Sequence, residues 1–288
     1  MADTIVGLGS GLYNVDCAKL TAPEEVFFDG LSDVAILNHE IIIARRAKTN
    51  LMVFTLRGQF VRSVNIKGFH TVHGLRALGN GELAMTDMDG HNVFLLGSDG
   101  SSLRTLSKNG MPRFQKAFNH PCDCDRAGNG NYYVADGYGN SVVHIFNRAL
   151  EHVRTFGKPG DGKGEFSTPH SVLIDDQQRV CVADRENNRV QRFDLEGNYL
   201  DEIGGVYKPM ALEKLPNGTL LCTDQTPRLS AFTPDGELVG RCRTFGTYGH
   251  GLAVAEDGTI VVAEMLPNRI SILRPTSATR SAHSSHSF

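Results

Sequence analysis

The sequence lacks the features that usually mark a membrane, secreted or nucleic-acid-binding protein. No apolar run approaches the ~18 residues needed to span a bilayer, and the N-terminus, MADTIVGLGSGLYNVD, has no basic segment followed by an apolar one. The net charge of -3 and the pI near 6.4 leave no basic excess for nucleic acid or anionic membrane. We therefore expect a cytoplasmic monomer with no nucleic-acid or membrane partner, although a secreted form stripped of its leader would look the same.

The cysteines also lack a pattern. Their spacing matches no disulfide framework, and a chain of 288 residues buries enough apolar surface to fold without cross-links. We interpret them as mostly reduced thiols, at positions 17, 122, 124, 181, 222 and 242.

A repeated unit runs through the chain, and its clearest copy lies between Ser167 and Phe193. There, SVLI, RVCVAD and RVQRF alternate apolar and polar residues between polar corners, which is typical of short antiparallel strands. Six second strands can be aligned in this way: IIIARR, LAMTDM, YYVADG, VCVADR, LLCTDQ and IVVAEM. The turns before them are rich in Asn, Asp and Gly, as tight hairpins require.

Repeats of about 40 to 50 residues with four strands each are blades of a β-propeller. The sequence therefore predicts an all-β fold, a single six-bladed propeller over residues 1–274 whose sixth blade lacks a fourth strand of its own. A segment around Tyr13 to Leu20 is expected to supply that strand and close the ring. The predicted blades span residues 31–70, 71–117, 118–167, 168–207, 208–248 and 249–274, and residues 275–288 are expected to be a disordered tail.

Two other architectures compete with the closed propeller. A pair of packed β-sandwich domains does not explain six matched copies. An open solenoid needs polar capping repeats, and neither end of the chain resembles one. The closed ring is therefore favoured.

The first strand of each blade runs beside the central channel, so one column of aligned residues should form a ring around the axis. Counting back 14 residues from the acidic end of the second strands reaches three histidines, a cysteine and a methionine. The first hairpin is about two residues shorter than the others, which places an aspartate near the same level. The predicted ring, in blade order, is Asp33, His73, Cys122, His170, Met210 and His250.

The three histidines belong to blades two, four and six, which are related by about 120° in a six-bladed ring. Their imidazoles should meet on the axis, and three histidine ligands with one open position are the arrangement of catalytic zinc. Zinc is the expected metal, and iron, copper or manganese also suit three imidazoles. The competing interpretation, three separate core histidines bonded to backbone, is weaker because polar groups packed together in a channel must find partners.

The other ring members carry less specific signals. Cys122, like Cys124, and Met210 are interpreted as channel-wall packing rather than ligands. Asp33 is interpreted as a ligand of a hard cation or as a partner that orients a histidine. Histidines outside the column are assigned structural, surface or tail positions: His70, His91, His144, His283 and His286.

Several stretches resemble a known family. VADGYGNSVVHIF (134–146), FGKPGDGKGEFSTPHSVLI (156–174) and VADRENNRVQRF (182–193), with VHGL (72–75) and GHGLAVAEDGT (249–259), are similar to NHL-type propellers. They are more closely similar to the peptidyl-α-hydroxyglycine α-amidating lyases. The resemblance covers blades two to four and six, and it reaches blades one and five only through the repeat.

The resemblance implies zinc held by His73, His170 and His250, an active-site tyrosine at Tyr138 and a substrate-binding arginine at Arg185. The implied reaction cleaves the C–N bond of an N-acyl α-hydroxyglycine, a small molecule or peptide C-terminus, into an amide and glyoxylate. The metal would polarise a substrate oxygen, Tyr138 would take the hydroxyl proton, and Arg185 would bind the carboxylate. From the residues alone, Tyr138 is interpreted as an aromatic side chain at a corner of its blade, and Arg185 as the ion-pair partner of an acidic neighbour.

The chain departs from this family at the third histidine. Gly251 stands where the family has an aspartate that binds a structural calcium, so calcium is expected only if Asp33 replaces that aspartate. Tyr248 stands where the family has a methionine, which predicts a second phenol in the substrate pocket beside Cys122 and Met210.

Other departures concern the first and third blades. A first-blade arginine of the family has no clean match, because Arg45 and Arg46 sit elsewhere in the repeat. The family's disulfide cysteine is replaced by Gly139, in agreement with a reducing compartment.

We therefore expect a metal-dependent carbon–nitrogen lyase of the amidating-lyase type. A second hypothesis is another propeller metalloenzyme, such as a lactone hydrolase, but those enzymes typically use carboxylate and asparagine ligands to calcium, which this ring lacks. A third is a non-catalytic NHL-repeat scaffold, which would present a basic or apolar face that the composition does not suggest.

Overall fold

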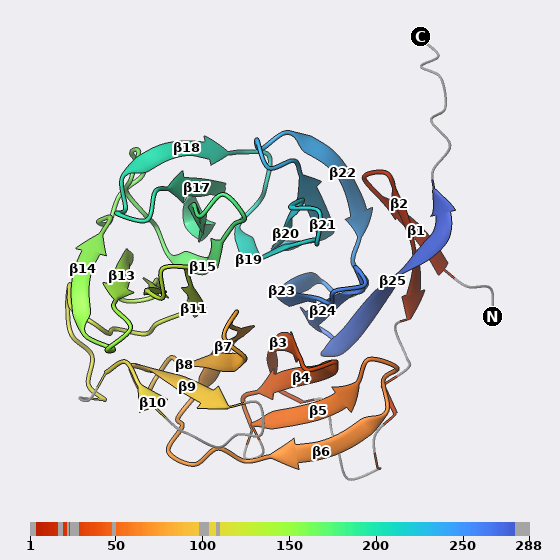
Figure 1. Ribbon diagram of the computed structural model, residues 1–288, viewed down its shortest axis with the longest axis horizontal. Helices are drawn as coiled ribbons and strands as arrows, with labels where there is room; N and C mark the ends of the chain where they lie inside the picture. The colour runs from red at the N-terminus through yellow and green to blue at the C-terminus, as the bar shows by residue number, and fades with distance from the viewer. Residues whose placement is uncertain are drawn as a thin grey trace.

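Six antiparallel sheets surround a central channel, and the all-β six-bladed propeller predicted from the repeats is confirmed (Figure 1). The computed structural model describes residues 4–16, 20–21, 23, 29–47, 50–97, 104–107 and 110–279. Among these residues, no helix has the length and apolar character needed to cross a membrane.

Each of the first three blades has four strands, and the innermost strand comes first. Blade one contains β3 (Leu31–Leu37), β4 (Glu40–Arg45), β5 (Leu51–Thr55) and β6 (Phe60–Val64). Blade two contains β7 (Val72–Ala77), β8 (Glu82–Asp87), β9 (Asn92–Gly97) and β10 (Arg104–Thr105). Blade three contains β11 (Asp123–Arg126), β12 (Tyr132–Asp136), β13 (Val142–Phe146) and β14 (His152–Phe156).

The remaining blades follow the same plan, with additions in blades four and six. Blade four contains β15 (Pro169–Ile174), β16 (Val180–Asp184), the 3₁₀ turn η1 (Arg185–Asn187), β17 (Arg189–Phe193) and β18 (Tyr199–Ile203). Blade five contains β19 (Pro209–Lys214), β20 (Leu220–Asp224), β21 (Thr226–Phe232) and β22 (Leu238–Arg243). Blade six contains β23 (Tyr248–Val254), β24 (Ile260–Met265), β25 (Arg269–Thr279), β2 (Gly11–Asp16) and β1 (Thr4–Leu8).

The core lies between the blades. In β16, Val180 and Val182 pack toward blade three, whereas Cys181 and Ala183 pack toward blade five. Alternate side chains of a strand point to opposite faces of its sheet, and both faces of a blade are covered by neighbours. This explains why the second strands are almost continuously apolar.

The N-terminus closes the ring through blade six. β2 pairs with β25, with Tyr13 opposite Pro275 and Asp16 opposite Ile272. The closing strand starts two residues earlier than the predicted segment and ends at Asp16, and residues 17–19 lie outside the described residues. β1, which the sequence did not predict, adds a fifth strand by pairing with β2.

β25 extends past the predicted start of the tail at residue 275 and ends at Thr279. Its last residues pair with β2 through the backbone, which needs no apolar side chains, so the Ser/Thr-rich composition did not reveal the strand. Residues 280–288, which include His283 and His286, lie outside the described residues.

The turn between β1 and β2 packs on Gly240 of β22. A Cβ at Gly240 would lie 2.3 Å from the backbone nitrogen of Gly9, whereas a Cβ at Gly204 would meet nothing within 4 Å. We expect Gly240→Ala to lower the free energy of unfolding by about 1–3 kcal/mol and to speed proteolysis of the N-terminal strands. The matched Gly204→Ala variant should stay within about 0.5 kcal/mol of wild type in urea unfolding. Equal stability of the two variants would contradict this description of the closure.

Candidate metal centre

A buried acidic residue at the end of the second strand anchors the start of the innermost strand in blades two to six. Asp136, for example, accepts hydrogen bonds from the backbone N–H of Asn119 at 2.9 and 3.0 Å, three residues before Cys122. The equivalent acids accept backbone N–H groups from the same entry loops: Asp87 from Thr71, Asp184 from Ser167, Asp224 from Tyr207 and Glu264 from Phe245. In blade one the charges are exchanged. The residue at the end of the second strand is the basic Arg45, and it pairs at 3.1 Å with the acidic Asp29, which precedes the innermost strand.

An irregularity in strand pairing then places one residue of the innermost strand at the channel in five of the six blades, whereas Cys122 of blade three directly precedes β11. In blade four, Pro169 pairs with Asp184 and Ser171 with Ala183, so His170 is left over between them. A bulge of this kind re-aims the side chain of the extra residue. Similar register shifts surround Ser32, His73, Met210 and His250.

The pairing corrects the predicted ring in blade one. The extra residue there is Ser32, because Leu31 pairs with Arg45 and Asp33 with Ala44. The first hairpin is therefore one residue shorter than the others, rather than two, and Asp33 lies one position further along the channel. We call Ser32, His73, Cys122, His170, Met210 and His250 the channel ring.

The three histidines of the channel ring converge on the axis. One ligand nitrogen from each lies within 4.8 Å of the other two, and the ring centroids are 4.8, 4.9 and 5.1 Å apart. His73, His170 and His250 are only 1%, 2% and 6% exposed. Among the described residues they form the one group of three or more such side chains within metal-binding distance.

Hydrogen bonds to the backbone determine which nitrogen of each histidine faces the axis. The Nδ1 atoms lie 2.9 Å from the carbonyl oxygen of Cys122 for His73, 2.8 Å from that of Met210 for His170, and 2.6 Å from that of Ser32 for His250. A carbonyl only accepts, so each Nδ1 carries the proton and each Nε2 keeps its lone pair. Every partner belongs to the next blade, which gives the site threefold character.

Burial keeps the imidazoles neutral. It lowers the pKa of His73 to about 4, with a further contribution from the nearby Arg46, and it lowers the pKa of His170 and His250 well below the ordinary value of 6.5. Neutral imidazole is the ligating form. Three inward Nε2 atoms held by Nδ1–H···O=C bonds therefore fit a transition metal such as zinc.

Tyr138 and Arg185 lie over one side of this histidine group. The Tyr138 hydroxyl is 3.1 Å from Nε2 of both His73 and His170, and it accepts a 3.2 Å hydrogen bond from Nη1 of Arg185. Burial, with the Cys122 thiol, raises the pKa of Tyr138 to about 12, and Arg185 acts in the opposite direction. A phenol and a guanidinium thus meet at the metal-facing nitrogens.

Arg46 is a site residue that the sequence comparison missed. It follows the last residue of β4 directly, as Arg185 follows that of β16, so the aligned second strands IIIARR and VCVADR already place the two arginines in one column. Its Nε donates to the Ser32 hydroxyl at 3.3 Å, and its charge lowers the pKa of His73 and His250. Arg46 therefore faces the histidine group from blade one.

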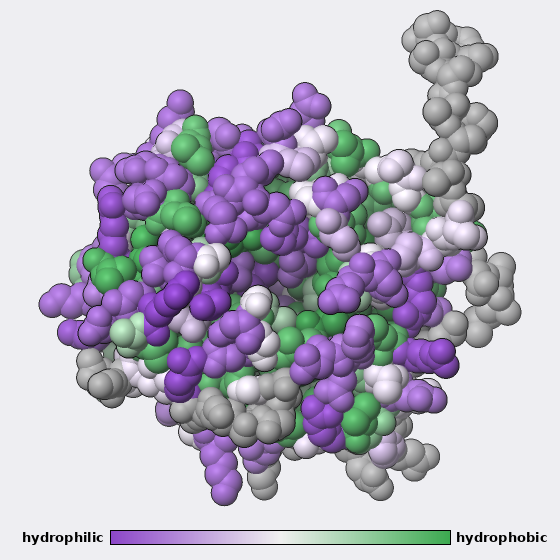
Figure 2. Space-filling model, viewed as in Figure 1, coloured by the Kyte–Doolittle hydropathy of each residue, from purple (hydrophilic) through white to green (hydrophobic). Residues whose placement is uncertain are grey.

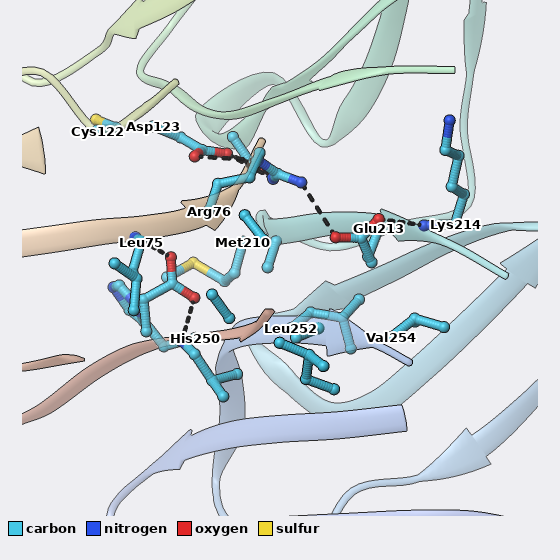
Figure 3. A pocket seen from close by; sticks show the side chains of 18 of the residues that line it. Leu75, Arg76, Cys122, Asp123, Met210, Glu213, Lys214, His250, Leu252 and Val254 are labelled. Atoms are coloured by element: carbon cyan, nitrogen blue, oxygen red, sulfur yellow. Dashed lines mark hydrogen bonds and ion pairs between the residues drawn. The ribbon is translucent and has the colours of Figure 1, made fainter. Parts of the chain in front are cut away.

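The opposite side of the histidine group opens into a cavity of about 450 Å³ (Figure 3). Arg76 crosses it: Nη2 bonds to Asp123 at 2.8 Å and to the Leu212 carbonyl at 3.1 Å, and Nη1 lies 3.3 Å from Glu213. Figure 3 shows Arg76 between these two carboxylates, with apolar Leu252 and other side chains facing them. Tyr138 and Arg185 do not line this cavity.

The residues present do not fit the structural calcium of the amidating lyases. A Cβ at Gly251 would lie 2.2 Å from Oδ1 of Asp33, so Asp33 fills the space that an aspartate at 251 would need. Its two oxygens accept the backbone N–H groups of Val34 and Leu75, both at 2.8 Å. Burial raises its pKa well above the usual range. A carboxyl group that favours its protonated form is a poor ligand for a hard cation, and Arg76 already supplies positive charge nearby.

The other predicted pocket residues contribute in different ways. Cys122 and Met210 are buried and offer their carbonyl oxygens to histidines, while burial raises the pKa of the Cys122 thiol to about 12. The Tyr248 hydroxyl contacts the sulfur of Met265 at 3.6 Å. Cys124 is a buried core residue, and the five described cysteines are free thiols.

The histidines assigned outside the column lie away from the three-histidine group. His144 is fully buried and donates to Asp136 at 3.1 Å, whereas the side chain of His70 is 69% exposed. His91 accepts the backbone N–H of His120 at 3.2 Å.

Comparisons with known proteins agree with the fold and bear on the site. A family model described as a 6-bladed beta-propeller (DUF5128) matches residues 126–220. The chain is 31% identical over 229 residues to "Probable peptidyl-alpha-hydroxyglycine alpha-amidating lyase pgal-1" of Caenorhabditis elegans, covering 72% of this chain and 64% of that protein. It is 29% identical over 255 residues to peptidyl-glycine alpha-amidating monooxygenase A of Xenopus laevis, covering 80% of this chain and 27% of the relative.

Two further similar proteins are not named as amidating lyases. NHL repeat-containing protein 3 of Homo sapiens is 29% identical over 295 residues, covering 93% of this chain and 80% of that protein. A streptogramin B lyase structure superposes with a TM-score of 0.67 at 12% identity, covering 92% of this chain and 98% of that one, which shows the fold alone.

Fold and site together define a six-bladed β-propeller with a buried group of three histidines. Within that class, the chain is related at about 30% identity to the amidating-lyase proteins and to NHL repeat-containing protein 3. It spans only part of the amidating relatives, 27% of the frog enzyme and 64% of the worm protein.

The depressed histidine pKa values predict how acid affects the metal-free protein. Between about pH 4 and 6.5 the unfolded chain takes up a proton at His73 that the folded chain does not, so stability falls as the pH falls through this window. The slope is at most about 1.4 kcal/mol per pH unit for one histidine.

Chelator-treated wild type and His73→Asn should be unfolded in urea at pH 4.5, 5.5 and 6.5. We expect the unfolding free energy of wild type to fall more steeply toward acid than that of the variant. Parallel pH profiles would mean that His73 takes up its proton over the same pH range in the folded and the unfolded protein, which would contradict the lowered pKa.

Proposed function

We propose that this protein is a metal-dependent lyase that cleaves the C–N bond of an N-acyl α-hydroxyglycine, giving an amide and glyoxylate. The observation that carries the proposal is the placement of the Tyr138 hydroxyl 3.1 Å from two inward histidine nitrogens and 3.2 Å from Arg185. The relation to amidating-lyase proteins supports the same reaction.

The residues supply the parts that this reaction needs. A zinc or similar ion on the three Nε2 atoms would act as a Lewis acid toward a substrate oxygen and favour the deprotonated form of a nearby phenol. Tyr138 is the base that takes the proton of the substrate hydroxyl. The C–N electron pair leaves with the amide nitrogen as the C=O bond of glyoxylate forms, and Tyr138 returns the proton to that nitrogen.

Two arginines orient the substrate carboxylate in this proposal. Arg185 sits beside Tyr138 with its side chain 14% exposed, and Arg46 faces the same histidines from blade one. Guanidinium groups bind carboxylates in a planar, often bidentate geometry. The carboxylate is thereby held while the hydroxyl faces Tyr138 and the histidine group.

A non-catalytic scaffold is the second candidate function. The relation to NHL repeat-containing protein 3, which extends over 93% of this chain and whose name gives a repeat rather than a reaction, is the reason to keep it. A scaffold needs no metal-dependent chemistry, so the two candidates differ in one assay.

Zinc-loaded protein mixed with N-benzoyl-α-hydroxyglycine should release glyoxylate in a continuous coupled assay. Tyr138→Phe removes the base and should lower kcat by about 10²–10⁴-fold with little change in KM. Arg185→Lys should mainly raise KM. Tyr199→Phe, on the outer strand β18, is the matched control and should behave as wild type. Metal-loaded wild type that releases no glyoxylate above the uncatalysed rate would refute the proposed activity.

A further inference from the structure

A chain of three charged side chains joins blades four and five beside the candidate site. Arg185 donates through Nε to Oε1 of Glu186 at 2.9 Å, and Lys208 lies 2.8 Å from the other oxygen, Oε2. Glu186 thus holds one cation on each of its oxygens. The Lys208 side chain is 31% exposed and that of Glu186 32%, so the group lies at the rim rather than in the core.

Arg185 is held by two bonds that leave one amine for a ligand. Its Nη1 donates to Tyr138, its Nε donates to Glu186, and its guanidinium carbon lies 5.1 Å from the centre of the Tyr138 ring. Neither hydrogen bond uses Nη2. The arginine is therefore oriented before any ligand arrives.

Lys208 is itself anchored by its backbone. Its N–H donates to the side-chain oxygen of Asn188 at 3.0 Å, and its carbonyl accepts the N–H of Gln225 at 3.2 Å. It directly precedes β19 and stands two residues before Met210 of the channel ring. The lysine is thus a defined part of the rim.

The charges explain what the lysine contributes. Glu186 is adjacent to the arginine and would by itself neutralise it, because the two make a direct ion pair. Lys208 balances Glu186 instead, and the group of three keeps one net positive charge. Burial alone would raise the pKa of Glu186, but the bonds from Lys208 and Arg185 lower it overall, so the glutamate is ionised.

We propose that Lys208 is a specificity-determining residue that keeps Arg185 available to the carboxylate of an anionic substrate. Through Glu186 it positions the guanidinium, and by neutralising Glu186 it preserves the positive charge of the site. The role in substrate binding rests on the proposed function, whereas the preference for a carboxylate ligand does not depend on turnover.

A purely structural salt bridge would have a different signature. Ion pairs exposed to this extent contribute about 0–1 kcal/mol to stability, so losing Lys208 should scarcely change unfolding. Its effect should instead appear in binding of an anion, at low salt more than at high salt. Lys214 offers a matched comparison, because its side chain is 32% exposed, pairs with Asp176 at 2.6 Å and ends the strand β19 that Lys208 directly precedes.

The experiment measures the Kd of N-benzoylglycine, a stable carboxylate probe, for the zinc-loaded full chain by calorimetry at low ionic strength. Lys208→Met should weaken binding about tenfold, because a nearby charge in partly screened surroundings acts on this scale. Adding Glu186→Gln to that variant removes the unbalanced carboxylate and should restore binding to within about twofold of wild type. Lys214→Met should bind as wild type, although it changes the net charge equally. The neutral N-benzoylglycinamide should show no difference among the variants.

Three results would overturn the inference: unchanged binding in Lys208→Met, no recovery in the double variant, or an equal loss in Lys214→Met. Wild type that fails to bind the carboxylate probe would overturn it as well. Glyoxylate release, measured separately on wild type, tests the proposed activity. The expected binding pattern without turnover would refute the lyase and leave the role of Lys208 standing.

Discussion

The hydrogen bond from each axial histidine to the next blade is the constraint on which the site depends. It joins blade two to three, four to five and six to one, and it leaves every Nε2 lone pair facing the axis. The bond forms only because a bulge presents the histidine to the channel and a buried acid sets the start of the strand. Fold and metal-binding chemistry are therefore linked through one backbone–imidazole contact, repeated three times.

The two sides of the histidine group differ in charge and in accessibility. One side carries Tyr138, Arg185 and Arg46, which suit an anion with an ionisable hydroxyl. The other side opens into the cavity crossed by Arg76, whose guanidinium reaches from blade two to Asp123 of blade three, Ser171 of blade four and the Leu212 carbonyl of blade five. A substrate carboxylate is therefore expected on the side of Tyr138. In the cavity on the other side, the Arg76 guanidinium is already paired with the carboxylates of Asp123 and Glu213. The space-filling view shows mostly hydrophilic residues over the visible face of the blades, with apolar residues in smaller groups (Figure 2).

Much of this could be predicted from the repeat, because the same short-range rules act in every copy. Turn residues and alternating strands define six blades, and a constant spacing from the acid to the bulge aligns the histidines. Prediction went wrong where blade one breaks those rules: Arg45 replaces the acid and the hairpin is one residue shorter, so Asp33 was assigned the place of Ser32. Contacts between residues at different positions of the repeat, such as that of Lys208 with Glu186, depend on how neighbouring blades pack together. The sequence of a single repeat therefore does not predict them.

The most direct test of the three-histidine metal site is anomalous diffraction from crystals of the purified protein, recorded on both sides of the zinc absorption edge. We predict one ion on the propeller axis, bound by Nε2 of His73, His170 and His250 at roughly 2.0–2.1 Å, with a further position open toward Tyr138. An axis that stays free of metal after zinc is supplied, with the three imidazoles bonded to water or to one another, would contradict it.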